Sequence, residues 1–135
     1  KHLSSTLHGK LKRVYQVLMK TLKKDMILLL EYLLSKKTGA TPLSNRAINY
    51  VFSSNNEIGF NSPSPYTKKS IDNVLSSTKN NLNQWITVKA NVKDDFKKFH
   101  DLDVNEIDGI AIMTDTDNSK LKAITYYQNI FFSSE

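Results

Sequence analysis

Short runs of hydrophobic residues separated by polar ones recur along most of this chain, which is the pattern of β-strands. Residues 47–52 form the densest run of strand-forming side chains. Residues 71–76 and 85–89 predict further strands, with a turn at residues 79–83 between them. Residues 62–66 predict a rigid surface loop, because their two prolines fix φ and lack an N–H group.

One segment changes period and predicts a helix. Three apolar residues within residues 91–100 recur at helical spacing and share a face: Val92, Phe96 and Phe99. Asn91 can cap the free N–H groups of a first turn, and Asp94 and Asp95 complement the positive end of the helix dipole. We therefore expect one short helix near residues 91–100.

The end of the chain predicts a β-hairpin. An apolar strand at residues 109–113 is followed by a polar turn and then by an aromatic strand within residues 121–132. Asp115, Asp117 and Asn118 have the side chains that favour such a turn.

The segment near the N-terminus leaves two alternatives open. Apolar residues between 11 and 22 fall at helical spacing, and residues 26–34 form a nearly continuous apolar run. Periodicity favours a helix there. Turn residues at 36–42 and the need of the other strands for partners favour a strand.

Many short strands with one packed helix are typical of a mainly β protein, either a β-sandwich or a jelly roll. A chain of 135 residues is long enough to bury a core as one domain, so we expect a single domain over residues 1–135. The chain begins at Lys1 rather than at a methionine, which leaves open that first strands or a leader precede it.

The formal net charge is +6, and the excess lies near the N-terminus. Residues 1–37 contain nine Lys and Arg against two acidic residues, whereas the rest of the chain contains ten basic and eleven acidic residues. The chain has only two arginines, Arg13 and Arg46, which argues against nucleic acid as the partner.

No apolar run reaches the length that spans a bilayer, and there is no cysteine for a disulfide or a thiolate site.

Several motifs, taken in order, resemble the DUF3047 family of uncharacterised bacterial proteins. The likeness covers about residues 11–132, and Ile112-Met-Thr-Asp-Thr-Asp-Asn118 is its most specific part. The other matching motifs are Arg46-Ala-Ile-Asn-Tyr-Val-Phe52, Ser64-Pro-Tyr-Thr67, Gln84-Trp85, Val92 with Asp95-Phe96, Ala123 and Tyr126-Tyr127. The resemblance implies a galactose-binding-like or jelly-roll sandwich, export to the bacterial periplasm, no established activity, and a strand rather than a helix at residues 26–34.

Two departures from the family pattern bear on its acidic residues. The family's Tyr-Tyr-Gly-Asp-Ile ending is Tyr126-Tyr-Gln-Asn-Ile130 here, and Met26 replaces one acid of an Asp-Asp turn. A ligand role of those acids elsewhere in the family would not carry over to this chain.

The acidic turn is also the best candidate metal site. Asp115, Asp117 and Asn118 offer alternating oxygen ligands of the kind that calcium prefers. The pattern of an EF-hand loop fails, because Lys120 stands where its glycine should be. The alternative is a turn stabilised by its own side chains, without a metal.

Catalytic constellations are missing from the pattern. The three histidines, His2, His8 and His100, are dispersed, and no serine or glycine motif of a hydrolase or a phosphate loop is present. A glycosidase pair drawn from Asp94 or Asp95 with Asp115 or Asp117 is weaker than the structural explanation of these carboxylates. We expect no enzyme activity and no required cofactor.

The function expected from these observations is that of a non-catalytic interaction or structural module. It would act as an accessory or scaffold subunit of a cell-envelope assembly, such as a motor, secretion or transport complex. The alternative is a carbohydrate-binding module of the envelope that recognises a glycan or peptidoglycan. In that case Tyr66, Trp85 and Tyr127 would supply stacking rings, and Asp117 and Asn118 polar contacts. Because Tyr126 and Tyr127 point to opposite faces of a strand, we expect one of them to be exposed.

Overall fold

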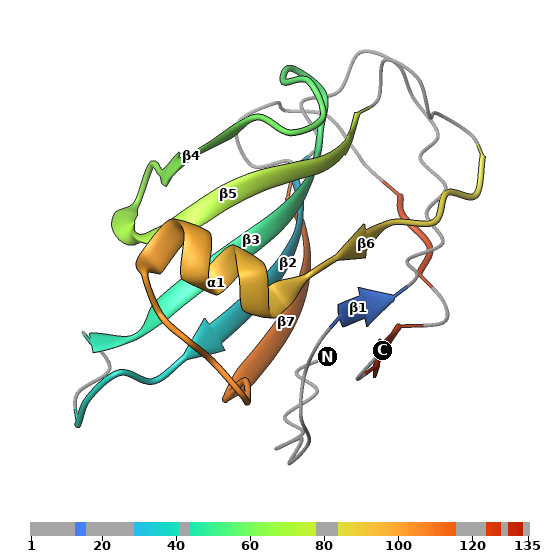
Figure 1. The fold of residues 1–135 in the computed structure, drawn as a ribbon. Coiled ribbons are helices and arrows are strands. Elements are labelled where there is room, and N and C mark those ends of the chain that lie inside the picture. The colour runs from blue at the N-terminus through green and yellow to red at the C-terminus, as the bar shows by residue number, and fades with distance from the viewer. Residues whose placement is uncertain are drawn as a thin grey trace.

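Short strands and one helix make up the part of the chain that the structure describes (Figure 1). The computed structural model describes residues 13–15, 29–40, 44–77, 84–115, 124–127 and 130–133. The strands are β1 (Arg13–Tyr15), β2 (Leu29–Lys36), β3 (Arg46–Ser53), β4 (Asn61–Ser64), β5 (Thr67–Ser77), β6 (Lys89–Ala90), β7 (Gly109–Asp115) and β8 (Phe131–Ser133). The helix is α1 (Val92–His100). The fold is therefore mainly β with one helix, as the sequence predicts.

The described strands form two sheets. The larger has the order β4-β5-β3-β2-β7 and the smaller has the order β6-β1-β8. The larger sheet is mixed, because β3 and β5 run parallel whereas its other neighbours are antiparallel. It also stays open at its two edge strands, β4 and β7. These strands do not establish the expected β-sandwich or jelly roll.

The apolar run near the N-terminus is a strand. β2 pairs with β3 on one side and with β7 on the other, in seven registered pairs on each side. A position between two strands satisfies its backbone on both edges, and this tertiary pairing overrides the local helical period. The strand expected from the family resemblance is confirmed at these residues.

The predicted terminal hairpin is wrong. β7 pairs with β2 in the larger sheet, whereas β8 pairs with β1 in the smaller one. A strand has two edges, so pairing with β2 does not by itself exclude a hairpin; the hairpin is lost because the aromatic end of the second segment pairs with β1 as β8. Residues 124–127 and 130 have no regular secondary structure, so the predicted second strand is confirmed only at β8.

Two shorter predictions are confirmed only in part, and a third lies outside the described residues. The loop expected at residues 62–66 is wrong in part, since β4 is a strand that contains Pro63. Proline is tolerated there because β4 is an edge strand, and its register shifts directly after Pro63. The strand expected at residues 85–89 reaches regular pairing only at β6. The turn expected at residues 79–83 lies outside the described residues.

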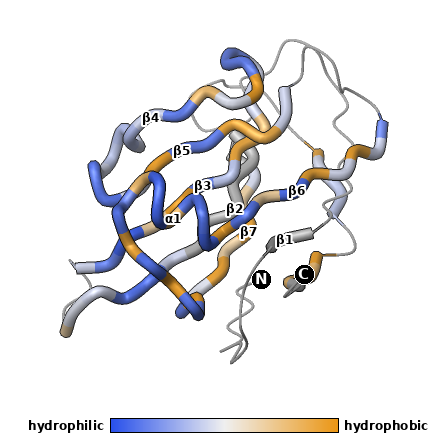
Figure 2. The backbone as a smooth tube through the Cα atoms, viewed as in Figure 1, coloured by the Kyte–Doolittle hydropathy of each residue, from blue (hydrophilic) through white to orange (hydrophobic). Residues whose placement is uncertain are grey.

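Helix α1 forms where the sequence predicts it. The Asn91 side chain accepts a hydrogen bond from the backbone N–H of Asp94, at 3.3 Å between Oδ1 and N. At the other end Asp101 has a left-handed conformation, with φ of 54°, and its N–H donates to the carbonyl of Lys97. In Figure 2 hydrophilic and hydrophobic positions alternate along α1, as expected of a helix that packs with one side.

The main core lies between one face of the larger sheet, α1 and the smaller sheet. Its buried members are Ile48, Tyr50 and Phe52 of β3, Ala90 of β6, Val92 and Phe96 of α1, and Val104 and Ile107 of the following loop. Ile130 and Phe132, at the smaller sheet, pack against this cluster. The core therefore joins elements from both halves of the chain.

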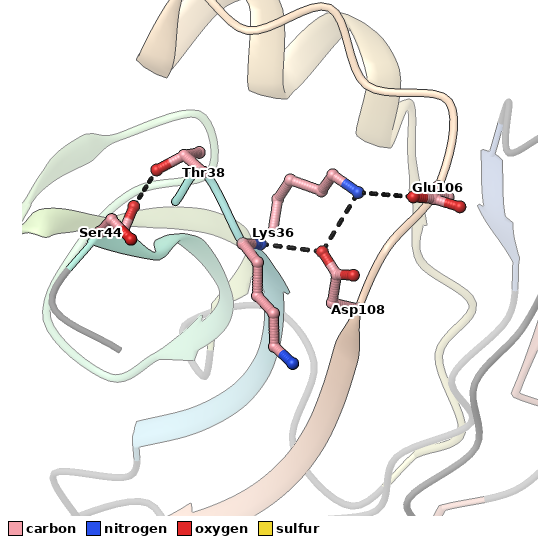
Figure 3. Close-up of polar contacts among 6 residues, drawn as sticks. Lys36, Thr38, Ser44, Glu106 and Asp108 are labelled. Carbon is pink, nitrogen blue, oxygen red and sulfur yellow. Dashed lines mark hydrogen bonds and ion pairs between the residues drawn. The ribbon is translucent and has the colours of Figure 1, made fainter. Parts of the chain in front are cut away.

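A polar cluster links the end of β2 to the start of β7 (Figure 3). The Lys36 Nζ lies 2.9 Å from Glu106 Oε1 and 3.2 Å from Asp108 Oδ2. The backbone N–H of Lys37 donates to the same Asp108 oxygen at 2.8 Å. This backbone hydrogen bond, together with the lysine charges, holds the pKa of Asp108 below its ordinary value of 3.8.

We expect Asp108→Asn to lower the free energy of unfolding at pH 7 by about 1 kcal/mol, because a partly exposed ionic hydrogen bond is screened by solvent. A carboxyl with a lowered pKa stabilises the fold above pH 3.8, and this contribution is lost as the pH falls toward its folded pKa. Urea unfolding at pH 7 and at pH 2.5 measures both effects. The control is Asp103→Asn, since Asp103 forms an exposed ion pair with Lys93. An equal loss at both pH values would contradict this role of Asp108.

Candidate functional site

A surface pocket lies beside the chain segment that leads into β6. In this segment Ile86 and Val88 are partly buried against the core, whereas Trp85 and Thr87 are exposed. This alternation follows from extended backbone, which turns successive side chains to opposite sides. The pocket has a volume of about 380 Å³. Its lining consists of Ile58, Leu75, Ser76, Gln84, Trp85, Ile86, Thr87 and Val88.

The pocket combines an aromatic ring with neutral polar groups. The Trp85 side chain is half exposed, with 45% of the residue accessible. Gln84, Thr87 and Ser76 add amide and hydroxyl groups, and none of the eight lining residues carries an ionisable side chain. The volume lies within the range of small-molecule sites. Such a pocket can bind a neutral polar ligand that presents a flat apolar face, and the part of its lining that the structure describes contains no ionisable acid or base.

Sequence reasoning found only Trp85 among these residues. Ile58 comes from the loop after β3, and Leu75 and Ser76 come from the end of β5. No local pattern joins these three segments. The one signal near the pocket is the polar and apolar alternation of residues 84–89.

Tyr66 lies at the turn between β4 and β5. It is the most exposed large hydrophobic residue among those described, with 82% of its surface accessible. Pro63 and Pro65 restrict the backbone on its N-terminal side, and the backbone N–H of Tyr66 lies 3.5 Å from the Ser64 hydroxyl oxygen. The ring therefore projects from a turn with little conformational freedom.

Tyr66 and Trp85 do not share one site. Tyr66 precedes the first residue of β5, whereas the pocket residues Leu75 and Ser76 lie near its last. The nine residue steps from Tyr66 to Leu75 along the strand correspond to roughly 30 Å at about 3.3 Å per residue. A single small ligand cannot contact both rings.

Tyr127 is partly buried, and its ring packs against the core cluster. Its hydroxyl donates to the Met113 carbonyl of β7 at 3.0 Å, and it lies 3.0 Å from the Thr114 hydroxyl. Because a phenol has one proton, Thr114 is the donor in the second contact. Burial raises the pKa of Tyr127 to about 12. The neighbouring Tyr126 is exposed, so the two tyrosines differ as expected.

The predicted calcium site falls largely outside the described residues. Asp115 is the last residue of β7, and Asp117 and Asn118 are not described. Among the described residues, no group of three or more His, Asp or Glu side chains could hold a metal ion. The calcium hypothesis for Asp115, Asp117 and Asn118 therefore stays a prediction.

The carboxylates on α1 have structural partners. Asp95 Oδ2 accepts a hydrogen bond from the Tyr50 hydroxyl at 2.8 Å, and Asp94 contacts the capping residue Asn91. Burial raises the pKa of Asp95, although the Tyr50 hydrogen bond acts in the opposite direction. Asp95 thus connects α1 to β3.

In the described part of the chain no helix has both the length and the apolar character needed to span a membrane.

Comparison with known proteins gives one match. The family model described as a protein of unknown function, DUF3047, matches residues 11–131, and this confirms the resemblance inferred from the motifs. No curated protein and no solved structure matches the chain significantly.

Proposed function

Since the chain belongs to the DUF3047 family, whose function is unknown, we propose from its exposed groups that it is a non-catalytic interaction module. In this proposal it acts as an accessory or scaffold subunit of an assembly in the bacterial periplasm. The single observation that carries the proposal is the exposed Tyr66 ring at the turn between β4 and β5.

An exposed tyrosine on a constrained turn suits protein recognition. Tyrosine supplies a large contact area and is enriched among the residues that dominate binding energy. The prolines on either side of Ser64 reduce the entropy that the turn would lose on docking. A turn whose backbone is already restricted in the free protein therefore loses less entropy when the ring enters a partner pocket.

The charge near this turn indicates the chemistry of the partner. The exposed Tyr66 ring is followed by two exposed lysines, Lys68 and Lys69. A partner with an apolar pocket and an acidic rim would complement both features. The uncharged lining of the Trp85 pocket supports binding rather than catalysis.

Carbohydrate binding is the second candidate, and the Trp85 pocket favours it. A half-exposed indole can stack on the apolar face of a sugar ring, while Gln84 and Thr87 can exchange hydrogen bonds with its hydroxyls. In this alternative the ligand is an envelope glycan or a peptidoglycan fragment. Tyr66 would play no part in binding such a small ligand.

The finer fold is also part of the proposal. We propose that the two sheets are the layers of a galactose-binding-like sandwich, in which α1 completes the smaller layer. Support comes from the core, where residues of β3 in the larger sheet pack together with Ala90 and Phe132 of the smaller sheet.

Binding of a protein partner tests the proposed role of Tyr66. Extracts of bacterial envelope proteins are passed over the immobilised chain, and the retained partner is then purified and its affinity measured. We expect Tyr66→Ala to weaken this affinity at least tenfold, because the ring is the proposed anchor. Phe60→Ala, which removes another exposed ring, is the control. Unchanged affinity of Tyr66→Ala would contradict the proposed anchor.

Sugar binding has its own readout. Trp85 is the chain's only tryptophan, so its fluorescence reports directly on the pocket. Under the carbohydrate alternative, peptidoglycan fragments change this emission in a saturable way, and Thr87→Ala weakens the response while Tyr66→Ala leaves it intact. Absence of any response across a glycan panel would remove the alternative.

A further inference from the structure

The face of the larger sheet opposite α1 carries a cluster of three polar side chains. Ile48, Tyr50 and Phe52 of β3 belong to the core that α1 covers. Alternation along the strand therefore places Asn49 on the opposite face. Register pairs Asn49 with Asp72, and Ala47 with Ser70, so Ser70 and Asp72 of β5 lie on that same face. We call Asn49, Ser70 and Asp72 the Asn49 cluster.

The Asn49 cluster contains buried polar atoms that the fold leaves unsatisfied. The Asn49 amide Nδ2 donates to Asp72 Oδ1 at 2.7 Å. Asn49 and Ser70 are only 4% and 5% exposed, yet Asn49 Oδ1 and the Ser70 hydroxyl oxygen have no hydrogen-bond partner. Native proteins pair nearly all buried polar atoms, so two exceptions on the same face of adjacent strands call for a bound species that satisfies them.

We propose that the Asn49 cluster binds a small monovalent cation, sodium or potassium. The cluster presents an amide oxygen, a hydroxyl oxygen and a carboxylate, which are the oxygen ligands that hard cations prefer. Asp72 supplies one negative charge, so a monovalent cation makes the site neutral. A divalent cation would leave a net positive charge in a buried place, and an anion would meet the carboxylate.

The surroundings of Asp72 agree with this choice. Burial raises the pKa of Asp72, and among the described residues the hydrogen bond from Asn49 acts in the opposite direction. A bound cation would supply the missing favourable charge. Asp72 is also only partly buried and pairs with Ser62 of the short edge strand β4, so an ion would enter beside this edge strand.

Salt-specific thermal stability tests the site. Unfolding of the whole chain is followed by circular dichroism in NaCl, KCl and tetramethylammonium chloride at equal ionic strength, since the last cation is too large to enter. We expect Tm to be roughly 2 to 5 °C higher in the sodium or the potassium salt, because a ligand that binds only the folded state stabilises it. Asp72→Asn should remove this difference, whereas Asp94→Asn, which changes an exposed acid on α1, should keep it.

A second measurement guards against an Asp72 variant that fails to fold. The sodium-23 NMR line of the wild-type chain should broaden, and Ser70→Ala should raise the cation concentration for half-maximal effect about tenfold. Equal Tm values in the three salts with no line broadening would mean that only water fills the cluster, and would overturn the proposal. Retention of the salt difference by a folded Asp72→Asn variant would overturn it as well.

Discussion

Replacement of Phe96 by alanine is expected to lower the free energy of unfolding by about 3 to 5 kcal/mol. Phe96 is the largest fully buried side chain among the described residues, with 0% exposed. It lies on α1 in the core cluster between β3 and the loop that carries Val104 and Ile107. Its removal takes away burial and leaves a cavity between elements that cannot close around it.

Urea unfolding followed by circular dichroism measures this loss. Such a loss is a large share of the 5 to 15 kcal/mol that stabilises an ordinary domain. Phe96→Leu is therefore needed as a milder variant, with an expected loss of about 1 kcal/mol. Phe60→Ala, at an exposed position, serves as the control. If Phe96→Ala and Phe60→Ala had equal effects, α1 would not be packed against β3 as described.

Tyr50→Phe is expected to lower the free energy of unfolding by about 2 kcal/mol at pH 7. The Tyr50 hydroxyl, on a residue only 2% exposed, donates to Asp95 Oδ2 at 2.8 Å. Its removal leaves a partly buried carboxylate without this donor, and a hydrogen bond to a charged group is worth more than a neutral one.

The effect of Tyr50→Phe should depend on pH. Burial raises the folded pKa of Asp95 above the ordinary value of 3.8. Between 3.8 and the raised pKa the folded state holds more protons than the unfolded state, so the stability that this group contributes to the wild type falls as the pH rises. The loss in Tyr50→Phe should be larger at pH 7 than at pH 3, because protonation of Asp95 at low pH removes the charge to which the hydroxyl donates. Unfolding at both pH values is the measurement. The control is Tyr50→Phe made in an Asp95→Asn background. There the loss of unfolding free energy caused by Tyr50→Phe should no longer depend on pH. A Tyr50→Phe loss that does not change with pH would contradict the charge-assisted bond.

Local patterns were sufficient for the elements whose stability is local. The helix at 92–100 follows from its cap at Asn91, its acidic first turn and its apolar stripe, all of which act within a few residues. The strand formers at residues 47–52 likewise predict β3. The family membership was also evident from motifs, in particular from residues 112–118.

Strand partners were not predictable in this way. The predicted hairpin was wrong because β8 pairs with β1, while β7 pairs with β2, which lies about 80 residues earlier. The same distant pairing made residues 29–36 a strand against their period. The sequence also did not predict which candidate ligand residues share a site. Tyr66 and Trp85 lie near opposite ends of β5, and Tyr127 packs against the core.

The sequence by itself determined that this protein is mainly β and where its helix begins, because these features depend on side chains that act on the backbone close to them. Its motifs also showed that it is a member of DUF3047. Only the tertiary structure decided which strands pair, that Trp85 borders a pocket with Ile58 and Leu75, and that Asn49 lies beside Asp72 and on the same face as Ser70. The reason is that ladder pairing and burial are set by competition among segments far apart in the chain, and the free energy of that competition has no signature in any single segment.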